Sequence, residues 1–188
     1  MIKKPMLMQK KTTAVLMITV TVLAAAGIIY SLFPLEYEGF IKKYSDKFGI
    51  DRYITAALIK AESSFDSEAV SRADAYGIMQ LTRQTFAYCM ESLDMENNSD
   101  DIFDTEKNIM AGTWYMAKML EKYNGDITCS AAAYNAGASN VDKWLKNSKY
   151  SHDGKTLFHI PFGETQRHVK KIRLYTRIYR VLYPGFNK

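Results

Sequence analysis

An uncharged apolar run of 22 residues at positions 12–33 constrains this chain more than any other feature of its sequence. As an α-helix rising about 1.5 Å per residue, the run spans the ~30 Å hydrocarbon core of a bilayer once. Four lysines precede it and acidic residues follow it. The positive-inside rule therefore predicts a short basic cytoplasmic tail (residues 1–11), a transmembrane helix (residues 12–33) and an extracytoplasmic domain (residues 34–188).

A cleavable signal peptide is the serious alternative for this segment. Three alanines at positions 24–26 offer a small-residue cleavage site. The apolar run continues through Ile28, Ile29, Leu32 and Phe33, which is long for a signal peptide. We therefore favour an uncleaved membrane anchor that leaves the domain outside the cytoplasmic membrane.

The composition of the chain indicates that, apart from the apolar run, it forms one ordinary globular domain. Hydrophobic residues make up 47% of the 188 residues and charged residues 24%, so disorder and a polytopic membrane protein are both excluded. The net charge of +5 is concentrated in the tail and in the segment from Lys143 onward. The basic side chains of the last helix alternate with apolar positions, as on a solvated helix face, so we predict no nucleic-acid partner.

Cysteine and histidine are too few and too scattered for a metal centre. Cys89 and Cys129 are the only cysteines, with no Cys-x-x-Cys spacing, and three histidines accompany them. We predict neither a metal nor another cofactor. The sequence leaves open whether the two cysteines pair or stay reduced.

Helical periodicity runs through the domain, and no pair of alternating strands with a hairpin turn is evident. Asp51, Thr82, Asp104 and Asp126 each stand where a side chain caps a helix start. The predicted fold class is all-α. The expected helices cover residues 36–48, 51–62, 82–93, 104–124, 126–135, 141–145 and 164–183.

Glu62 is the first candidate for chemistry. At 100° per residue it lies on the edge of an apolar stripe at the C-terminal end of its helix. Partial desolvation and the negative end of the helix dipole both disfavour an ionised carboxylate, as a general acid requires. Taken alone, the residue also fits a surface glutamate with its head group in water.

Three further segments hold candidate ligand-binding groups. Residues 77–80 (GIMQ) follow short polar residues and suit a tight loop that presents a glutamine, or a turn with its methionine in the core. Residues 133–137 (AYNAG) place a phenol and an amide at a helix end, where they suit sugar recognition, and the glycine suits a helix C-cap. Glu164 opens the last helix, where an acid also complements the dipole.

In this order and at these separations, the segments resemble the catalytic domain of the soluble lytic transglycosylase family, lysozyme-like enzymes that cut peptidoglycan. The resemblance covers residues 37–183 and rests on several short motifs. These are residues 61–63 (AES) with Phe65, 69–71 (AVS), 77–81 (GIMQL), 108–109 (NI) with Gly112, 133–137 (AYNAG) and 160–165 (IPFGET) with Val169.

The resemblance implies a role for each matching residue. Glu62 corresponds to the single catalytic acid, Ser63 completes its signature, and Glu164 corresponds to a supporting glutamate. The implied substrate-binding residues are Ser63, Ser71, Met79, Gln80, Tyr134, Asn135 and Glu164. The chain departs from the family pattern at Leu81–Arg83, which lacks a common proline, at Asp74 in place of glycine, and at His168 in place of tyrosine.

The implied reaction cleaves the bond between N-acetylmuramic acid and N-acetylglucosamine in peptidoglycan glycan strands. One carboxyl first protonates the glycosidic oxygen and then accepts the proton of the muramyl C6 hydroxyl, which leaves a 1,6-anhydro end. A hydrolytic muramidase on the same fold and a non-catalytic glycan-binding module remain as alternatives.

Overall fold

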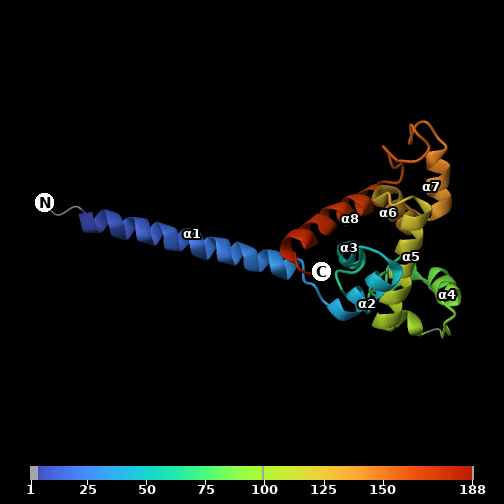
Figure 1. Cartoon of the computed structure of the whole chain (residues 1–188), viewed down its shortest axis with the longest axis horizontal. Coiled ribbons are helices and arrows are strands. Elements are labelled where there is room, and N and C mark those ends of the chain that lie inside the picture. The colour runs from blue at the N-terminus through green and yellow to red at the C-terminus, as the bar shows by residue number, and fades with distance from the viewer. Residues whose placement is uncertain (1–3, 99, 188) are drawn as a thin grey trace. The chain divides into compact units, whose positions relative to one another are not determined.

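The computed structural model describes residues 4–98 and 100–187 and divides the chain into two units, residues 1–34 and 35–188 (Figure 1). The described part is mostly helical, which confirms the predicted all-α class. The second unit contains the domain core and all the candidate residues.

The first unit consists of helix α1, Lys4–Leu32. Its segment Thr12–Leu32, with a mean hydropathy of 2.3, is long and apolar enough to cross a membrane. Thr19 and Thr21 donate their hydroxyls to the carbonyls of Val15 and Met17, at 2.9 Å each. Helical carbonyls thus satisfy these polar side chains without water. The part of the predicted basic tail at residues 1–3 lies outside the described residues.

Local signals set the helices of the second unit. Asp51, Thr82, Asp104 and Asp126 cap α3, α4, α5 and α6, each accepting a backbone N–H of the first turn, as predicted. The helices are α2 (Glu38–Phe48), α3 (Arg52–Glu62), α4 (Arg83–Ser92), α5 (Thr105–Lys122), α6 (Ile127–Ala136), α7 (Ala138–Leu145) and α8 (Gly163–Leu182), with a 3₁₀ turn at Asp101–Phe103.

The expectation that the domain lacks strands is wrong at one place. Strands β1 (Ala75–Tyr76) and β2 (Leu81–Thr82) pair antiparallel around the 77–80 loop, and Val70 bridges to Tyr76. Strands of two residues are too short to show an alternating pattern, so the sequence contained no periodic signal for them. The pairing turns residues 75–82 into a closed loop beside the end of α3.

Helix α3 lies at the centre of the second unit, where α8 and α2 pack against it (Figure 1). Ala56, Ala57, Leu58 and Ile59 are all fully buried, so this helix is covered on every side. Helix α8 also packs on α6, and α5 packs on α2, α4 and α6. The C-terminal end of α3 therefore comes out of the core between α8 and the 75–82 loop.

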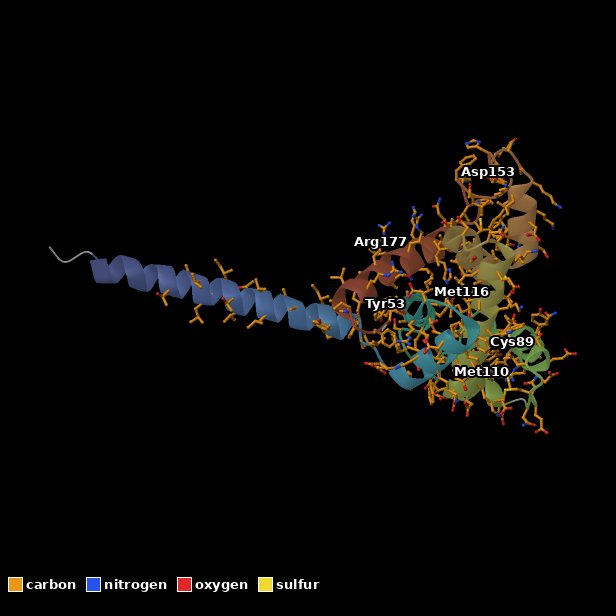
Figure 2. All side chains as sticks on the ribbon, viewed as in Figure 1. Tyr53, Cys89, Met110, Met116, Asp153 and Arg177 are labelled. Carbon is orange, nitrogen blue, oxygen red and sulfur yellow. The ribbon has the colours of Figure 1, made fainter. Side chains whose placement is uncertain are left out.

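The two cysteines are free and buried. Burial raises the pKa of the Cys89 thiol, labelled on α4 in Figure 2, to about 12. Burial, followed by the charge of Asp126, raises the pKa of Cys129 to about 12 as well. Both thiols are therefore protonated and inert at neutral pH.

Asp153 organises the long loop between α7 and α8 (Figure 2). Its carboxylate accepts the backbone N–H groups of Lys155 and Thr156 at 2.8 Å each, the Thr156 hydroxyl at 2.8 Å and the Ser151 hydroxyl at 3.2 Å. These donors, the Thr156 N–H first, lower the pKa of Asp153 far below its usual value. The loop delivers the chain to the first turn of α8, where Glu164 lies.

Candidate active site

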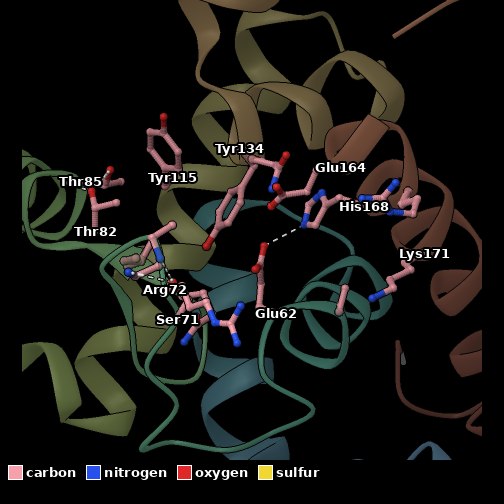
Figure 3. A pocket seen from close by; sticks show the side chains of 17 residues that line it. Glu62, Ser71, Arg72, Thr82, Thr85, Tyr115, Tyr134, Glu164, His168 and Lys171 are labelled. Atoms are coloured by element: carbon pink, nitrogen blue, oxygen red, sulfur yellow. Dashed lines mark hydrogen bonds and ion pairs between the residues drawn. The ribbon is translucent and has the colours of Figure 1, made fainter. Parts of the chain in front are cut away.

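A pocket of about 570 Å³ opens where the end of α3, the 71–82 segment, α5, α6 and the first turns of α8 meet (Figure 3). A volume of this size is typical of ligand sites. Five of the predicted residues besides Glu62 lie on its wall. The lining comprises Ala61, Glu62, Ser71, Arg72, Ala73, Ala75, Gln80, Leu81, Thr82, Thr85, Tyr115, Tyr134, Asn135, Glu164, Arg167, His168 and Lys171.

Glu62 is the last residue of α3, and its side chain is 13% exposed. Its Oε1 lies 2.8 Å from Nε2 of His168, whose side chain is 8% exposed. Residues 55–59 of α3 are buried, so the carboxyl at the end of this helix leaves the core directly into the pocket wall. Partial desolvation at a helix C-terminus is what the sequence predicted for this residue.

Behind the wall, Asn108 of α5 holds the 77–80 loop in place. It is fully buried, and its Oδ1 accepts the Met79 N–H at 2.8 Å. Its Nδ2 donates to the carbonyls of Ile102 at 2.7 Å and Tyr76 at 3.2 Å. Two of these bonds reach residues 29 and 32 positions away in the sequence, and the third reaches the 3₁₀ turn before α5, so one amide fixes the loop against α5.

Two glycines allow this close packing. A Cβ on Gly77, whose φ is +74°, would lie 2.5 Å from Nδ2 of Asn108 and 2.7 Å from the carbonyl oxygen of Ile102. A Cβ on Gly112 would lie 2.5 Å from the sulfur of Met79. The motif residues Asn108 and Gly112 thus support the pocket without lining it.

Tyr134 joins α6 to the same loop. Its hydroxyl donates to the Met79 carbonyl at 2.9 Å, and its ring lies 5.4 Å from that of Tyr115. Burial, followed by the negative charge of Glu62, raises the pKa of Tyr134 well above its usual value, and burial also raises that of Tyr115. Both phenols are therefore uncharged at neutral pH, and they line the same pocket as Glu62.

Asn135 and Gln80 each use one end of the amide for structure. Thr165 donates its hydroxyl to Oδ1 of Asn135 at 2.6 Å, so the Asn135 nitrogen remains to meet a ligand. The Gln80 nitrogen donates to the carbonyls of Ala69 at 3.0 Å and Gly77 at 2.9 Å, so its Oε1 remains. The pocket wall thus presents one amide donor and one amide acceptor.

Ser71 lines the pocket, and its hydroxyl oxygen accepts the N–H groups of Ala73 at 3.2 Å and Ala75 at 3.1 Å. Glu164 lines it from the first turn of α8 and is exposed. The two carboxyls of the pocket, Glu62 and Glu164, therefore differ in solvation.

Ser63 and Met79, both predicted to bind substrate, do not reach the pocket. Ser63 donates its hydroxyl to the Ile78 carbonyl at 2.7 Å, which ties the end of α3 to the loop. Met79 is fully buried and packs against Gly112. Met79 takes part through its backbone, whose two polar groups bind Asn108 and Tyr134.

Sequence reasoning missed several pocket residues. It noted His168 only as a departure from a motif, whereas the structure places His168 against Glu62. It passed over Tyr115, although this residue follows Gly112 by one helical turn of α5. It described the cations from Lys170 to Arg180 only as a solvated face; Lys171 is exposed as expected but also lines the pocket, as do the exposed Arg167 and Arg72.

An all-α frame with a desolvated glutamate at a helix end, facing an amide and aromatic cleft, defines a lysozyme-like domain. Residues 39–157 match the Transglycosylase SLT domain. The chain therefore belongs to the SLT transglycosylase family.

Curated relatives include two kinds of lytic transglycosylase. The soluble lytic murein transglycosylase of Escherichia coli K12 is 31% identical over 151 residues, which are 79% of this chain and 23% of that protein. The membrane-bound lytic murein transglycosylase C of Photorhabdus laumondii is 35% identical over 124 residues, 61% of this chain and 35% of that protein. The chain thus spans about a quarter to a third of these relatives.

Solved structures agree with this membership. The 70 kDa soluble lytic transglycosylase of Escherichia coli matches with a TM-score of 0.74 and 28% identity, over 85% of this chain and 26% of that one. An inactive glutamate-to-glutamine mutant of the lytic transglycosylase Slt from Pseudomonas aeruginosa matches with a TM-score of 0.71 and 26% identity, over 79% of this chain and 24% of that one.

Proposed function

We propose that this protein is a peptidoglycan lytic transglycosylase that cleaves the bond between N-acetylmuramic acid and N-acetylglucosamine and leaves 1,6-anhydromuramic ends. One observation carries the proposal. Glu62 places a largely desolvated carboxyl, 13% exposed, on the wall of a cleft whose neutral amides and phenols suit sugar binding.

In the proposed reaction Glu62 acts twice. Its protonated carboxyl donates to the glycosidic oxygen as the bond from that oxygen to the muramyl C1 breaks. The muramyl C6 hydroxyl then adds to C1, and its proton returns to the Glu62 carboxylate. The proton that Glu62 donates is thus replaced by the one it accepts, and no water is consumed. The substrate's acetamido group stabilises the cationic centre. Gln80, Asn135 and Tyr134 orient the sugar rings, so that binding holds the reacting atoms in place beside Glu62.

The charges on the pocket wall fit an anionic glycan. Arg72, Arg167 and Lys171 line the pocket, and within the described part of the chain none of them forms an ion pair or hydrogen bond. Muramic acid and its peptides carry carboxylates. Three unneutralised cations beside the cleft attract such a polymer and help to align it.

Replacing Glu62 with glutamine tests the acid. Glutamine keeps the size of the side chain but has no acidic proton to donate, so turnover should fall by roughly 10² to 10⁴ while glycan binding persists. Mass spectrometry of products from purified peptidoglycan should find anhydro ends with the wild type, each lighter by one water than a hydrolytic end. Undiminished turnover in Glu62→Gln would overturn the assignment.

A hydrolytic muramidase is the second candidate, because Glu164 brings another carboxyl to the same pocket. Hydrolytic glycosidases usually have two carboxyl groups that flank the glycosidic bond. Reducing ends among the products would favour this candidate over a transglycosylase.

We also propose that residues 12–33 anchor the enzyme in the membrane with the domain on the wall side. The apolar helix and the lysines before it support this topology. Protease added to intact spheroplasts should then digest residues 34–188. Complete protection, or a mature N-terminus at Gly27 with the protein free in the medium, would contradict it.

A further inference from the structure

His168 makes direct contact with the proposed acid. Its Nε2 lies 2.8 Å from Oε1 of Glu62, although 106 positions separate the two residues in the sequence. The imidazole comes from α8 and the carboxyl from the end of α3, two helices that pack tightly together (Figure 3). Both side chains are largely buried, at 8% and 13% exposed, so water screens their interaction only weakly.

The other ring nitrogen indicates which nitrogen of His168 carries the proton. Nδ1 is buried and has no hydrogen-bond partner among the residues described. A proton on Nδ1, whether in the imidazolium or in the other neutral tautomer, would leave a buried N–H unpaired, which is costly. The neutral ring with its proton on Nε2 avoids that cost and donates to Oε1 of Glu62.

Charged and titratable groups from several elements surround the ring. The charged and titratable groups that face the pair across the pocket are Arg72, Tyr115, Tyr134, Glu164, Arg167 and Lys171. Three of these are cations and only one is a carboxylate besides Glu62. Burial raises the pKa values of both phenols, so they contribute no negative charge at neutral pH. The Tyr134 ring lies nearly parallel to the imidazole, at 8°, with centroids 6.5 Å apart.

We propose that His168 is a positioning residue that donates from Nε2 to Oε1 of Glu62 and so directs the chemistry of Glu62 to a single oxygen. This inference rests on the proposed function. Because Oε1 of Glu62 accepts the hydrogen bond from the His168 Nε2–H, the proton that the Glu62 carboxyl donates is on Oε2. That proton passes from Oε2 to the glycosidic oxygen, and the proton of the C6 hydroxyl later returns to Oε2. The imidazole proton never leaves Nε2, and its hydrogen bond stabilises the carboxylate between the two steps.

Two substitutions in the full chain separate this role from simple packing. His168→Gln places an amide N–H near the position of Nε2 and has no proton equilibrium near neutral pH. His168→Leu is apolar and removes the donor. Melting curves of both variants show whether each is folded at the assay temperature.

The kinetics of the folded variants should differ in a defined way. We expect His168→Gln to retain the wild-type pH profile and a kcat within about threefold of wild type. We expect His168→Leu to lower kcat by about 10- to 100-fold at unchanged KM, since a hydrogen bond to a charged group is lost. Without that donor the carboxylate is less stable, so the alkaline limb of its profile should move up by about one pH unit. Unchanged kinetics in His168→Leu, or a limb that disappears in His168→Gln, would overturn the proposal.

Nitrogen-15 NMR of histidine-labelled protein provides a readout that does not depend on catalysis. The chain has three histidines, and the signal missing from His168→Gln identifies His168. We expect the proton of this ring to lie on Nε2 and the Nδ1 signal to be that of an unprotonated nitrogen. A proton on Nδ1 refutes the proposal even if anhydro products are found. Conversely, the spectrum still tests His168 if the wild type yields no anhydro ends or if His168→Leu fails to fold.

Discussion

The buried amide of Asn108 offers the sharpest test of how the pocket is built. Asn108→Ala removes three hydrogen bonds at 2.7, 2.8 and 3.2 Å from a fully buried position. The Met79 N–H then has no acceptor, and the carbonyls of Ile102 and Tyr76 each lose a donor.

The expected loss of stability follows from these contacts. An unsatisfied buried polar group costs about 1–3 kcal/mol, and carbonyls with a second lone pair to use cost less than an orphaned N–H. Together the three losses amount to about 3 kcal/mol. For a domain of this size, 1 kcal/mol changes the melting temperature by roughly 2–4 °C, so Asn108→Ala should melt roughly 6–12 °C lower.

Asn140→Ala is the matched control. Its Nδ2 makes a single bond, to the Ala136 carbonyl at 2.7 Å, in a part-buried position away from the pocket wall. The expected loss is about 1 kcal/mol. Differential scanning calorimetry of the full chain in detergent compares the two variants with wild type.

Activity should separate the variants further. The backbone of Met79 also receives the Tyr134 hydroxyl, and Gln80 follows it directly, so a displaced loop moves two pocket residues together. Well below both melting temperatures, Asn108→Ala should lose at least tenfold in turnover, whereas Asn140→Ala keeps most of it. Equal melting temperatures, or full turnover in Asn108→Ala, would refute the view that this amide holds the pocket.

Two further predictions concern charge. Because backbone donors lower the native pKa of Asp153, its carboxylate stabilises the fold above the ordinary aspartate pKa of ~3.9, and that contribution is lost as pH falls through the lower native value. The gap in melting temperature between wild type and Asp153→Asn should therefore narrow from about pH 5 towards pH 2, and a constant gap would contradict the assignment. Lys171→Ala should raise KM for peptidoglycan by about two- to fivefold at low salt and less at high salt, while Lys170→Ala, outside the pocket wall, should leave it unchanged; equal effects of both would exclude a specific role.

The sequence alone determined the features that depend on neighbouring residues. The four capping residues that it indicated all accept first-turn N–H groups, and Gly49 ends α2 in the left-handed conformation. The length of the apolar run also followed directly from the sequence. Caps, stops and spans act within one helical turn or one continuous segment, so their causes lie side by side in the chain.

The order of the motifs also indicated that Glu62, Gln80, Tyr134 and Asn135 share one cleft, and the structure brings them to one pocket. The sequence did not determine which side chains face that pocket. Met79 turns into the core because Gly112 leaves room for its sulfur, and this depends on a helix more than thirty residues away.

Only the tertiary structure decided the partner of the proposed acid. His168 and Glu62 meet because α8 packs along α3, and nothing near either residue in the sequence indicates a contact across 106 positions. The same holds for Asn108 and the 77–80 loop, whose bonds span up to 32 positions. Desolvation and hydrogen bonding at a buried group depend on which distant segments cover it, and that is fixed only when the helices pack.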